Sequence, residues 1–488
     1  MMGSPTGVTT ASDLTLYALS DPLVLAGHYF LVVLKGAVEV NGTVIEASLR
    51  EIPVSCPLPP FYAIKPARSF VQASYLANDS HRDAATVVGI KPNPLTNFSK
   101  LASPFKSLFP ELTVVSDRPE LQPFKSWKSL SSQIDHGHKV VLLGPKNSGK
   151  SSLGRYLINQ RIAKNQHVYY LDLDPGQGEF TPPGTLALCK VTDFVFGPPY
   201  SHCGFDNVVK AHSLGYVSPM DTPARYLDIF RDLYDKFLSV AENETLIVNT
   251  PGWTKGLGLE LNSDVCLSVT PDFLCHMGND EGFQDFTEAT KDACDHIVAV
   301  DAVDIGENAP RFSAAELRVA QSMAYFHKTN QDHLTTWNPY KLPYGKDGIY
   351  ALSVLDSDGI DLAQDAQVCT EGTIVAIAAC DSPPPISDFS MDIPFVTSDV
   401  SMELHKVSEC VGYAVIQYMS PDFIRLLTPL DPAVIGNRSV ILVRGRLKLP
   451  IWEIWDQTSS SPAPWLSSRA AGGLGGSQLK FRRNLQRR

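Results

Sequence analysis

The chain has 488 residues, a formal net charge of −11 and 44% hydrophobic residues. This length predicts two or three domains rather than one core, and the negative charge argues against a protein that coats nucleic acid nonspecifically. The N-terminal segment lacks the features of a secretory signal, and no apolar run reaches the length of a membrane span. The nine cysteines form no C-x-x-C pair, so we expect neither a zinc site nor a redox motif, and we expect a soluble intracellular protein.

Residues 1–123 are predicted to form a β-rich domain. Short apolar runs alternate here with turn-forming residues, and the pair Asn41-Gly42 indicates a hairpin. A small sandwich or barrel is the simplest architecture, and a structural or docking role is favoured because nothing in the segment indicates catalysis.

Residues 124–343 are predicted to form an α/β domain. A helix is expected over residues 121–135 as the lead-in to this domain. Strands are then expected at residues 138–144, 167–174, 244–250 and 295–303, and helices at residues 151–160, 223–240 and 313–327. Continuous apolar strands separated by amphipathic helices predict a parallel sheet that is covered on both faces. Ligands of such sheets bind at the carboxyl ends of the strands, so the residues that follow each strand matter most.

The C-terminal part divides into a β-rich domain at residues 344–457 and a tail at residues 458–488. Four apolar stretches, GIYALSVLD, GTIVAIAACD, YAVIQYMS and SVILVRGRLKLPIWEIWD, predict strands. The tail is rich in Ser, Pro and Gly and ends with basic residues, so its charge could contact RNA or a partner protein or could simply be solvated.

The stretch VVLLGPKNSGKSSLGR at residues 140–155 has the strand, glycine loop, Lys-Ser pair and helix of a phosphate-binding loop. Its glycines allow backbone N–H groups to surround a polyphosphate, and the following helix contributes its positive end. Lys150 is predicted to reach the β- and γ-phosphates, and the Ser151 hydroxyl to hold Mg²⁺. The predicted nucleotide-binding residues are Gly144, Pro145, Lys146, Asn147, Ser148, Gly149, Lys150, Ser151 and Ser152.

The second strand of this domain ends in LDLDPGQGEF. Asp172 and Asp174 are two residues apart, so on an extended strand both side chains point to one face, beside the phosphate-binding loop. One carboxylate could order Mg²⁺ and the other could accept a proton from an attacking hydroxyl. Turn formation explains Asp174-Pro175-Gly176 but not the pairing with the phosphate-binding loop, so catalysis is favoured.

Three further segments carry candidate binding residues. Trp253, after the third strand, offers a face for stacking a base or fills the core, and Lys255 adds charge. Ser218 and Thr222 could donate to phosphates, although Thr222 could equally cap a helix that begins at Pro223. Arg311 and Arg318 are seven residues apart and share a helix face. They could belong to a mobile lid over the phosphate-binding loop, or they could be solvated.

In combination these motifs resemble the polynucleotide 5′-hydroxyl kinase family, whose members are related to the kinase subunit of the pre-mRNA cleavage complex. The segments are GPKNSGKSS, LDLDPGQGEF, GYVSPMDTPARYL, NTPGWTKGLG and AYFH. The ribosomal-RNA-processing branch is the closer likeness, through DPGQ, the Ser-Pro segment and the late VRGRLKLPIW. The resemblance implies a central P-loop kinase domain between β-rich domains, although the long polar N-terminal extension common in this branch does not precede the first one.

The resemblance implies that the chain transfers the γ-phosphate of ATP, with Mg²⁺, to the 5′-hydroxyl of RNA. The predicted catalytic residues are Asp174, which resembles the base, Lys150, which carries the phosphate role, and Arg318, which resembles a lid arginine. Ser151 carries the metal role, and Asp172 resembles a residue that helps the metal. Ser218, Trp253, Lys255 and Gln177 resemble substrate-binding residues. The implied partners are a HEPN-domain endoribonuclease, whose cut leaves the 5′-hydroxyl, and a 5′→3′ exoribonuclease. The implied role is removal of the spacer from pre-rRNA, and the implied location is the nucleus, within the nucleolus.

Two other classes of protein share some of these features. A GTPase-like switch also has a phosphate-binding loop, but guanine selectivity needs an N/T-K-x-D segment where this chain has DIGENAPRF. A scaffold subunit that binds ATP and holds an RNA-processing nuclease complex together, without transfer, would keep the same nucleotide-binding residues. The presence of Asp172 and Asp174 with Lys150 favours activity over the scaffold.

Overall fold

A computed structural model describes residues 14–447, except for 69–72, 77–82, 96–106, 117–118, 280, 295, 304–311, 329–336, 346–347, 356–366, 368–369, 387, 391–392 and 397. The chain divides into two compact units. The first comprises residues up to 135 together with 151–168 and 191–202, and the second comprises residues 136–150, 169–190 and those from 203 onward. The predicted tail at residues 458–488 and Arg311 lie outside the described residues.

The first unit contains a β-sheet built from the N-terminal residues. Its described strands run in the order β1-β7-β2-β6-β3-β4, with β5 and β8 also paired to β2. The strands are β1 Thr15–Ala18, β2 Leu23–Lys35, β3 Ala37–Val40, β4 Thr43–Glu46, β5 Ile52–Cys56, β6 Ala63–Ala67, β7 Val87–Pro92 and β8 Thr113–Val114. The predicted hairpin is confirmed: Val40 pairs with Thr43, and Asn41 and Gly42 both have positive φ, as a two-residue turn of this kind requires.

Two helices belong to the first unit, α1 (Lys125–Gln133) and α2 (Lys150–Ile162). Buried polar side chains of α2 attach it to other parts of the unit. The Asn159 amide pairs with the backbone of Val195 at 2.7 and 3.0 Å, and Arg161 donates to the carbonyl of Ser131 at 2.9 Å. These bonds satisfy groups that would otherwise be buried without partners, and so they fix the register of α2.

The second unit contains the central sheet, in the order β12-β11-β10-β13-β9-β14-β15. Its strands are β9 Lys139–Leu143, β10 Val168–Asp172, β11 Thr185–Val191, β12 Val208–Ser213, β13 Leu246–Asn249, β14 Phe273–Met277 and β15 His296–Val300. The predicted parallel arrangement is confirmed for the neighbouring strands β10, β13, β9, β14 and β15, whereas β11 and β12 pair with each other antiparallel. Sequence reasoning missed β11, β12 and β14; the β14 run FLCHM is only five residues long.

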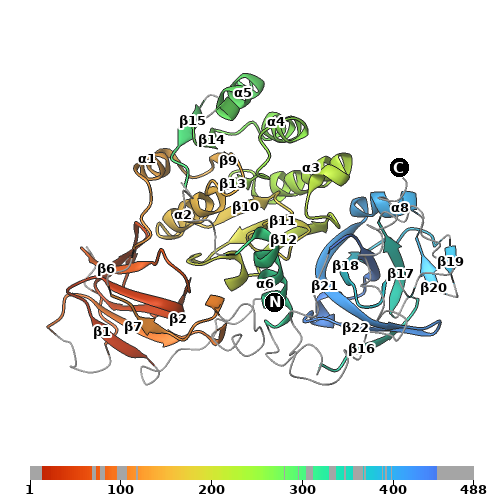
Figure 1. Cartoon of the computed structure of the whole chain (residues 1–488), viewed down its shortest axis with the longest axis horizontal. Helices are drawn as coiled ribbons and strands as arrows, with labels where there is room; N and C mark the ends of the chain where they lie inside the picture. Colours follow the sequence, from red (N-terminus) through yellow and green to blue (C-terminus); the bar gives the residue numbers. More distant parts are fainter. Residues whose placement is uncertain are drawn as a thin grey trace, which may run out of the picture. The chain divides into compact units, whose positions relative to one another are not determined.

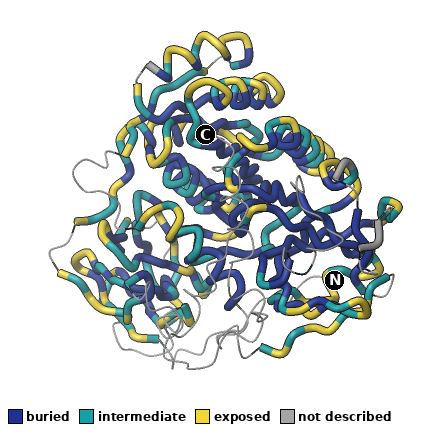
Figure 2. Tube along the Cα trace, turned by 45° about the vertical axis from the view of Figure 1, so that its right-hand side comes forward, coloured by how far each residue is buried: buried dark blue, intermediate teal, exposed yellow. Residues whose placement is uncertain are grey.

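Helices α3 (Pro223–Ala241), α4 (Leu257–Val269), α5 (Glu281–Thr290) and α6 (Ala314–Phe326) connect and follow these strands. Figure 1 shows α3, α4 and α5 succeeding one another beside the central sheet, and α3 and α5 both contact α4. The strands are buried over most of their length, and the exposed residues lie mainly on helices and loops (Figure 2). None of the described helices is both long enough and apolar enough to cross a membrane.

A third sheet, also in the second unit, follows α6. Its order is β16-β22-β21-β18-β23-β17-β20-β19. The strands are β16 Tyr340–Pro343, β17 Ile349–Val354, β18 Ile374–Cys380, β19 Asp388–Ser390, β20 Ile393–Phe395, β21 Ser408–Met419, β22 Phe423–Leu427 and β23 Ser439–Arg444. The predicted α/β class with β-rich segments before and after the central sheet is therefore confirmed. The domain limits at residues 123, 343 and 457 stay predictions.

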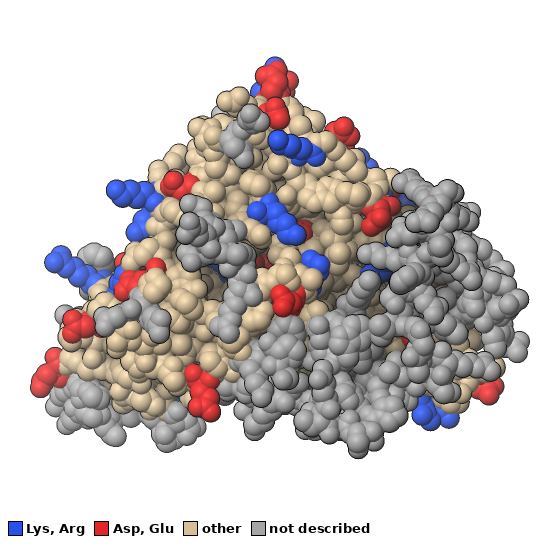
Figure 3. All heavy atoms as spheres, in the orientation of Figure 1, with Lys and Arg blue, Asp and Glu red and all other residues tan. Residues whose placement is uncertain are grey.

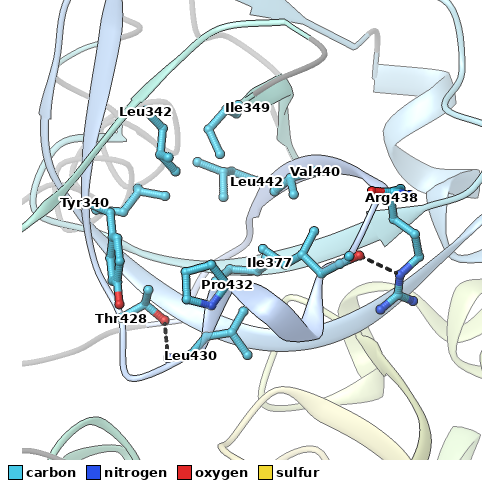
Figure 4. A pocket seen from close by; sticks show the side chains of 15 residues that line it. Tyr340, Leu342, Ile349, Ile377, Thr428, Leu430, Pro432, Arg438, Val440 and Leu442 are labelled. Carbon is cyan, nitrogen blue, oxygen red and sulfur yellow. Dashed lines mark hydrogen bonds between the residues drawn. The ribbon is translucent and has the colours of Figure 1, made fainter.

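The third sheet encloses a cavity of about 610 Å³ (Figure 4). Its lining is mostly apolar and comes from β16, β17, β18, β22, β23 and the turn after β22, with Leu342, Ile377 and Leu442 among the lining side chains. Arg438 at its edge is held by the carbonyl groups of Val434 and Ile435 and by Glu409. None of the predicted site residues lines this cavity.

Candidate phosphate-binding and catalytic site

The loop after β9 has the backbone that the glycine pattern predicts. Gly144, Asn147 and Gly149 all have positive φ, at 136°, 64° and 100°. A Cβ on Gly144 would lie 2.7 Å from Cβ of Met277, and one on Gly149 would lie 2.7 Å from Cγ2 of Val303. Both glycines are therefore required by conformation and by close packing, and the loop is held in one shape by β14 and by the residues after β15.

Lys150 is folded back over this loop. Its ammonium donates to the carbonyl oxygens of Gly144 at 2.8 Å and Pro145 at 2.9 Å, and the residue is only 7% exposed. Burial lowers the pKa of Lys150 to about 8, although the negative charge of Asp174 opposes the change. A buried cation beside loop carbonyls is available to phosphate oxygens, which would be stronger acceptors for the same ammonium.

The other loop residues have mainly local partners. The Ser148 hydroxyl donates to the carbonyl of Pro145 at 2.8 Å, and its own carbonyl accepts from the N–H of Val303 at 2.8 Å. Ser151 and Ser152 follow Lys150 in the first turn of α2.

Asp172 is the last residue of β10 and is 1% exposed. Its carboxylate accepts hydrogen bonds from the backbone N–H of Glu179, from the Asn249 amide at 3.1 Å and from the N–H of Asp174 at 3.4 Å. Burial raises the pKa of Asp172 to about 7. The hydrogen bonds from Glu179 and Asn249 oppose the change, and the nearby charges of Asp174 and Glu179 reinforce it. Sequence reasoning missed Asn249, whose signal was its place at the end of the neighbouring strand.

Asp174 lies two residues beyond the end of β10, in a turn. Its carboxylate accepts from the N–H groups of Gly176 at 2.9 Å and Gln177 at 3.1 Å, so the turn formation considered from the sequence does occur. Burial raises the pKa of Asp174, while Lys150 is the strongest of the opposing influences and Lys146 also contributes. The structure thus brings Asp172, Asp174 and Lys150 together, with Gln177 in the same turn.

Arg318 lies in α6 and is half-buried. Burial lowers the pKa of its guanidinium, and the nearby charge of Asp174 opposes the change, which places Arg318 within electrostatic reach of that carboxylate. The helix is capped by Ser313 and Glu316, and its residues from 320 to 326 are buried. The lid role of Arg318 stays a prediction; the structure shows that the second half of its helix is buried.

The segment after β13 lies against the phosphate-binding loop. A Cβ on Gly252 would lie 2.7 Å from Cα and 2.8 Å from N of Lys146, so the two backbones are in direct contact. The neighbouring Trp253 is partly exposed, and its carbonyl accepts from the Asn262 amide at 2.9 Å. Lys255 is exposed. Trp253 is therefore not a fully buried core residue, and it lies next to the loop.

Ser218 and Thr222 have different surroundings. Ser218 is partly exposed, and its hydroxyl accepts from the N–H of Met220 at 3.3 Å at the start of a 3₁₀ turn over Pro219–Asp221. Helix α3 begins at Pro223 as predicted, but the Thr222 hydroxyl makes no capping bond and is buried with no hydrogen-bond partner in the described chain. Ser218 thus remains accessible to a ligand, and Thr222 is inaccessible.

The described residues offer no ready-made metal site. They contain no group of three or more His, Cys, Asp or Glu side chains placed to hold a metal ion by themselves. The described cysteines are all free thiols, and all but Cys294 are buried. A divalent cation at this site would therefore share its coordination with a bound ligand or water, as Mg²⁺ usually does.

Charge on the surface in view is mixed. Figure 3 shows basic and acidic side chains interspersed rather than gathered into one large basic area. The prediction that the chain does not coat nucleic acid nonspecifically rests on its net charge of −11.

Comparisons with known proteins agree with this geometry. The family model for the P-loop of the mRNA cleavage and polyadenylation factor CLP1 matches residues 144–328. The polynucleotide 5′-hydroxyl-kinase grc3 of Aspergillus oryzae is 28% identical over 88% of this chain and 66% of its own length. The corresponding kinase GRC3 of Yarrowia lipolytica is 26% identical over 96% of this chain and 85% of its own length. These relatives confirm the resemblance to the polynucleotide 5′-hydroxyl kinase family.

Solved structures support the fold. A complex of wild-type Clp1p with Pcf11p matches with a TM-score of 0.50, and a second Clp1p–Pcf11p structure with 0.53, each at 15% identity over 88% of this chain. The matches cover 95% and 97% of those chains, which confirms the P-loop fold of the centre within a similar overall sequence of elements. The chain spans less than two thirds of the length of the first relatives, 66% of the Aspergillus oryzae kinase and 58% of the one from Gibberella zeae.

Proposed function

We propose that this chain is an ATP-dependent polynucleotide kinase that transfers the γ-phosphate of ATP to the 5′-hydroxyl of RNA. One observation carries the proposal: Asp174 follows β10 and the phosphate-binding loop follows β9 at the same edge of the parallel sheet, with only β13 between the two strands. Lys150 and Arg318 are both within electrostatic reach of the Asp174 carboxylate. Phosphoryl transfer to an alcohol needs a base and cations for the transferring group. The relatives are named as kinases of a polynucleotide 5′-hydroxyl, which supports the same reaction.

Asp174 is the proposed base. Burial raises the pKa of its carboxyl group toward that of an effective proton acceptor at neutral pH. Its turn hydrogen bonds to the N–H groups of Gly176 and Gln177 occupy one oxygen, Oδ1, and orient the carboxylate. The second oxygen is therefore the one proposed to accept the proton of the 5′-hydroxyl.

Lys150 and Arg318 are the proposed cations. Lys150 would exchange its contacts with Gly144 and Pro145 for phosphate oxygens, since these contacts hold the ammonium at the loop. Arg318 would stabilise the charge on the phosphoryl group during transfer. Both side chains are at least half-buried, and electrostatic interactions there are stronger than in water.

The residues present fit a magnesium ion. Ser151 supplies a hydroxyl directly after Lys150, and Asp172 supplies a buried carboxylate; Mg²⁺ prefers such oxygen ligands and is usually held by few protein groups. When bound, Mg²⁺ would neutralise charge on the phosphates. In this proposal Asn249 orients Asp172 by donating to one of its oxygens.

The acceptor RNA is proposed to contact the segment after β13. Trp253 is partly exposed and follows a glycine that touches the phosphate-binding loop, so a terminal base stacked on it would lie close to the site. Lys255 would attract the RNA backbone, and Ser218 and Gln177, both partly exposed, would donate to it.

The proposed setting is pre-rRNA spacer processing in the nucleolus. A HEPN-domain endoribonuclease would supply the 5′-hydroxyl end, and a 5′→3′ exoribonuclease would consume the 5′-phosphate. The likeness to the ribosomal-RNA-processing branch supports this setting, and the chemistry is consistent because each step produces the end group that the next step requires.

The test is transfer of labelled γ-phosphate from ATP to a short 5′-hydroxyl RNA. We would compare the native chain with Lys150→Ala, with Asp174→Asn and with Asp264→Asn, which removes a carboxylate on the exposed side of α4. We expect transfer by the native chain and by Asp264→Asn, and loss of transfer in both other variants, with ATP binding kept by Asp174→Asn.

Each of the other outcomes has a distinct meaning. Transfer only when the endoribonuclease is added would make the complex the enzyme. ATP binding without transfer in either condition would overturn the kinase and leave the scaffold subunit. Unchanged transfer by Asp174→Asn would remove Asp174 as the base.

A further inference from the structure

Helix α6 is attached to the loop that carries the proposed base. The Gln321 amide donates to the carbonyl oxygens of Gly178 and Thr181, each at 2.8 Å, and Gln321 is 4% exposed. Both acceptors belong to the segment that begins with Asp174. A single buried side chain therefore uses both of its donors to bind one helix to one loop, and the carbonyl oxygens would be buried without those partners if the amide were removed.

The same helix is attached to the third sheet one turn later. The Tyr325 hydroxyl accepts from the N–H of Tyr413 at 2.8 Å and donates to its carbonyl at 3.4 Å. The Tyr413 hydroxyl in turn lies 2.8 Å from the Thr185 hydroxyl and donates to that of Ser213 at 3.3 Å. The second half of α6 is thus fixed by buried hydrogen bonds on two sides, at Gln321 and at Tyr325.

Gln321 follows Arg318 by three residues, so the two side chains lie on neighbouring positions of one helix face. Gln321 binds Gly178 while Arg318 is within electrostatic reach of Asp174, four residues before Gly178. A helix that rotated or slid would have to break both Gln321 bonds before Arg318 could leave. The helix position and the loop position are therefore coupled through this one amide.

We infer that Gln321 is a positioning residue for phosphoryl transfer: by binding α6 to the loop that begins with Asp174, it fixes the position of Arg318 relative to that loop. This inference rests on the proposed kinase function. Gln321 contacts the loop and not the nucleotide or the RNA, so it affects phosphoryl transfer only through the position of Arg318. It extends the site to a residue that no sequence motif indicated.

The experiment is a double-mutant cycle between Gln321→Leu and Arg318→Ala in the full chain, with any partner that transfer requires. Gln321→Leu should lower kcat about ten- to hundredfold, because small displacements of a catalytic group cost that much, and should change the KM for ATP by less than about twofold. In the Arg318→Ala background the same substitution should lower kcat less than about threefold, since the group it positions is already gone.

Two further measurements separate positioning from folding. Ser322→Ala alters the next buried residue of α6 and should leave kcat unchanged. Gln321→Glu keeps the shape of the side chain but replaces the donating amide by a carboxylate. At neutral pH its kcat should therefore be as low as that of Gln321→Leu. As the pH is lowered toward 5, the protonated carboxyl group can donate again and part of kcat should recover. Thermal unfolding of Gln321→Glu at each pH separates the two roles: a positioning role restores kcat while the unfolding midpoint stays the same, whereas a structural role changes both together.

The inference is overturned if Gln321→Leu transfers as fast as the native chain, or if its effect is equally large with and without Arg318. A native chain that binds ATP but transfers nothing, with and without partner, would instead overturn the proposed kinase function itself.

Discussion

Lys150→Met is the substitution whose effect on stability the structure predicts most sharply. The ammonium of Lys150 is buried, and among the described residues it donates to the carbonyl oxygens of Gly144 and Pro145. Methionine fills similar volume without a charge. Transfer should be abolished, because the cation is lost, yet the folded state at neutral pH should become slightly more stable.

The magnitude follows from the lowered pKa of Lys150. A pKa of about 8 in place of 10.5 corresponds to a penalty of about 3 kcal/mol for keeping the buried amine protonated at pH 7. In the variant the carbonyl groups of Gly144 and Pro145 lose their donor, which costs about 2 kcal/mol, so the variant should gain about 1 kcal/mol. Because the folded pKa lies below the unfolded one, the unfolded chain binds more protons between pH 8 and 10.5. The native chain therefore gains stability across that window.

Thermal unfolding of the native chain and of Lys150→Met at pH 7, 8, 9 and 10, without nucleotide, measures this effect. The advantage of Lys150→Met should shrink above pH 8 and reverse by pH 10. Lys139→Met removes the same charge from the partly exposed start of β9 and controls for net charge. A Lys150→Met variant that is less stable at pH 7, or a difference that does not depend on pH, would refute the reasoning.

Three other predictions follow from contacts in the second unit. Gly252→Ala should weaken ATP binding about tenfold or more, because its Cβ would lie 2.7 Å from the backbone of Lys146. Gly178→Ala should bind ATP as the native chain does, because the nearest neighbour of its Cβ would be 3.4 Å away. Equal binding of ATP by both variants would contradict the close packing at Gly252. Trp253→Ala should raise the KM for RNA more than the Kd for ATP, and an equal effect on both would indicate packing. Burial alone would raise the pKa of Asp232, but hydrogen bonds from His212 and Lys210 lower it to about 2. Asp232→Asn should therefore lower the unfolding midpoint at pH 7, and this effect should disappear as the pH falls from 4 toward 2. A midpoint difference that persists at pH 2 would exclude the ionised carboxylate as its source.

Local chemistry in the sequence determined the phosphate-binding loop, the carboxylates and the hairpin. Gly144 and Gly149 need positive φ, Asn41-Gly42 specifies its own turn, and Asp172 and Asp174 follow a buried strand, so short-range rules were sufficient in each case. The parallel order of the central strands also followed from apolar runs that alternate with helices.

Tertiary structure alone decided which groups meet across the chain. Asn249 reaches Asp172 because β13 is the neighbour of β10, Gln321 reaches Gly178 over 143 residues of sequence, and the Thr222 hydroxyl lacks the capping bond that its position suggests. Such contacts depend on strand order and helix register. Those are set by the packing of the whole unit, whereas a sequence motif specifies only the conformation of its own few residues.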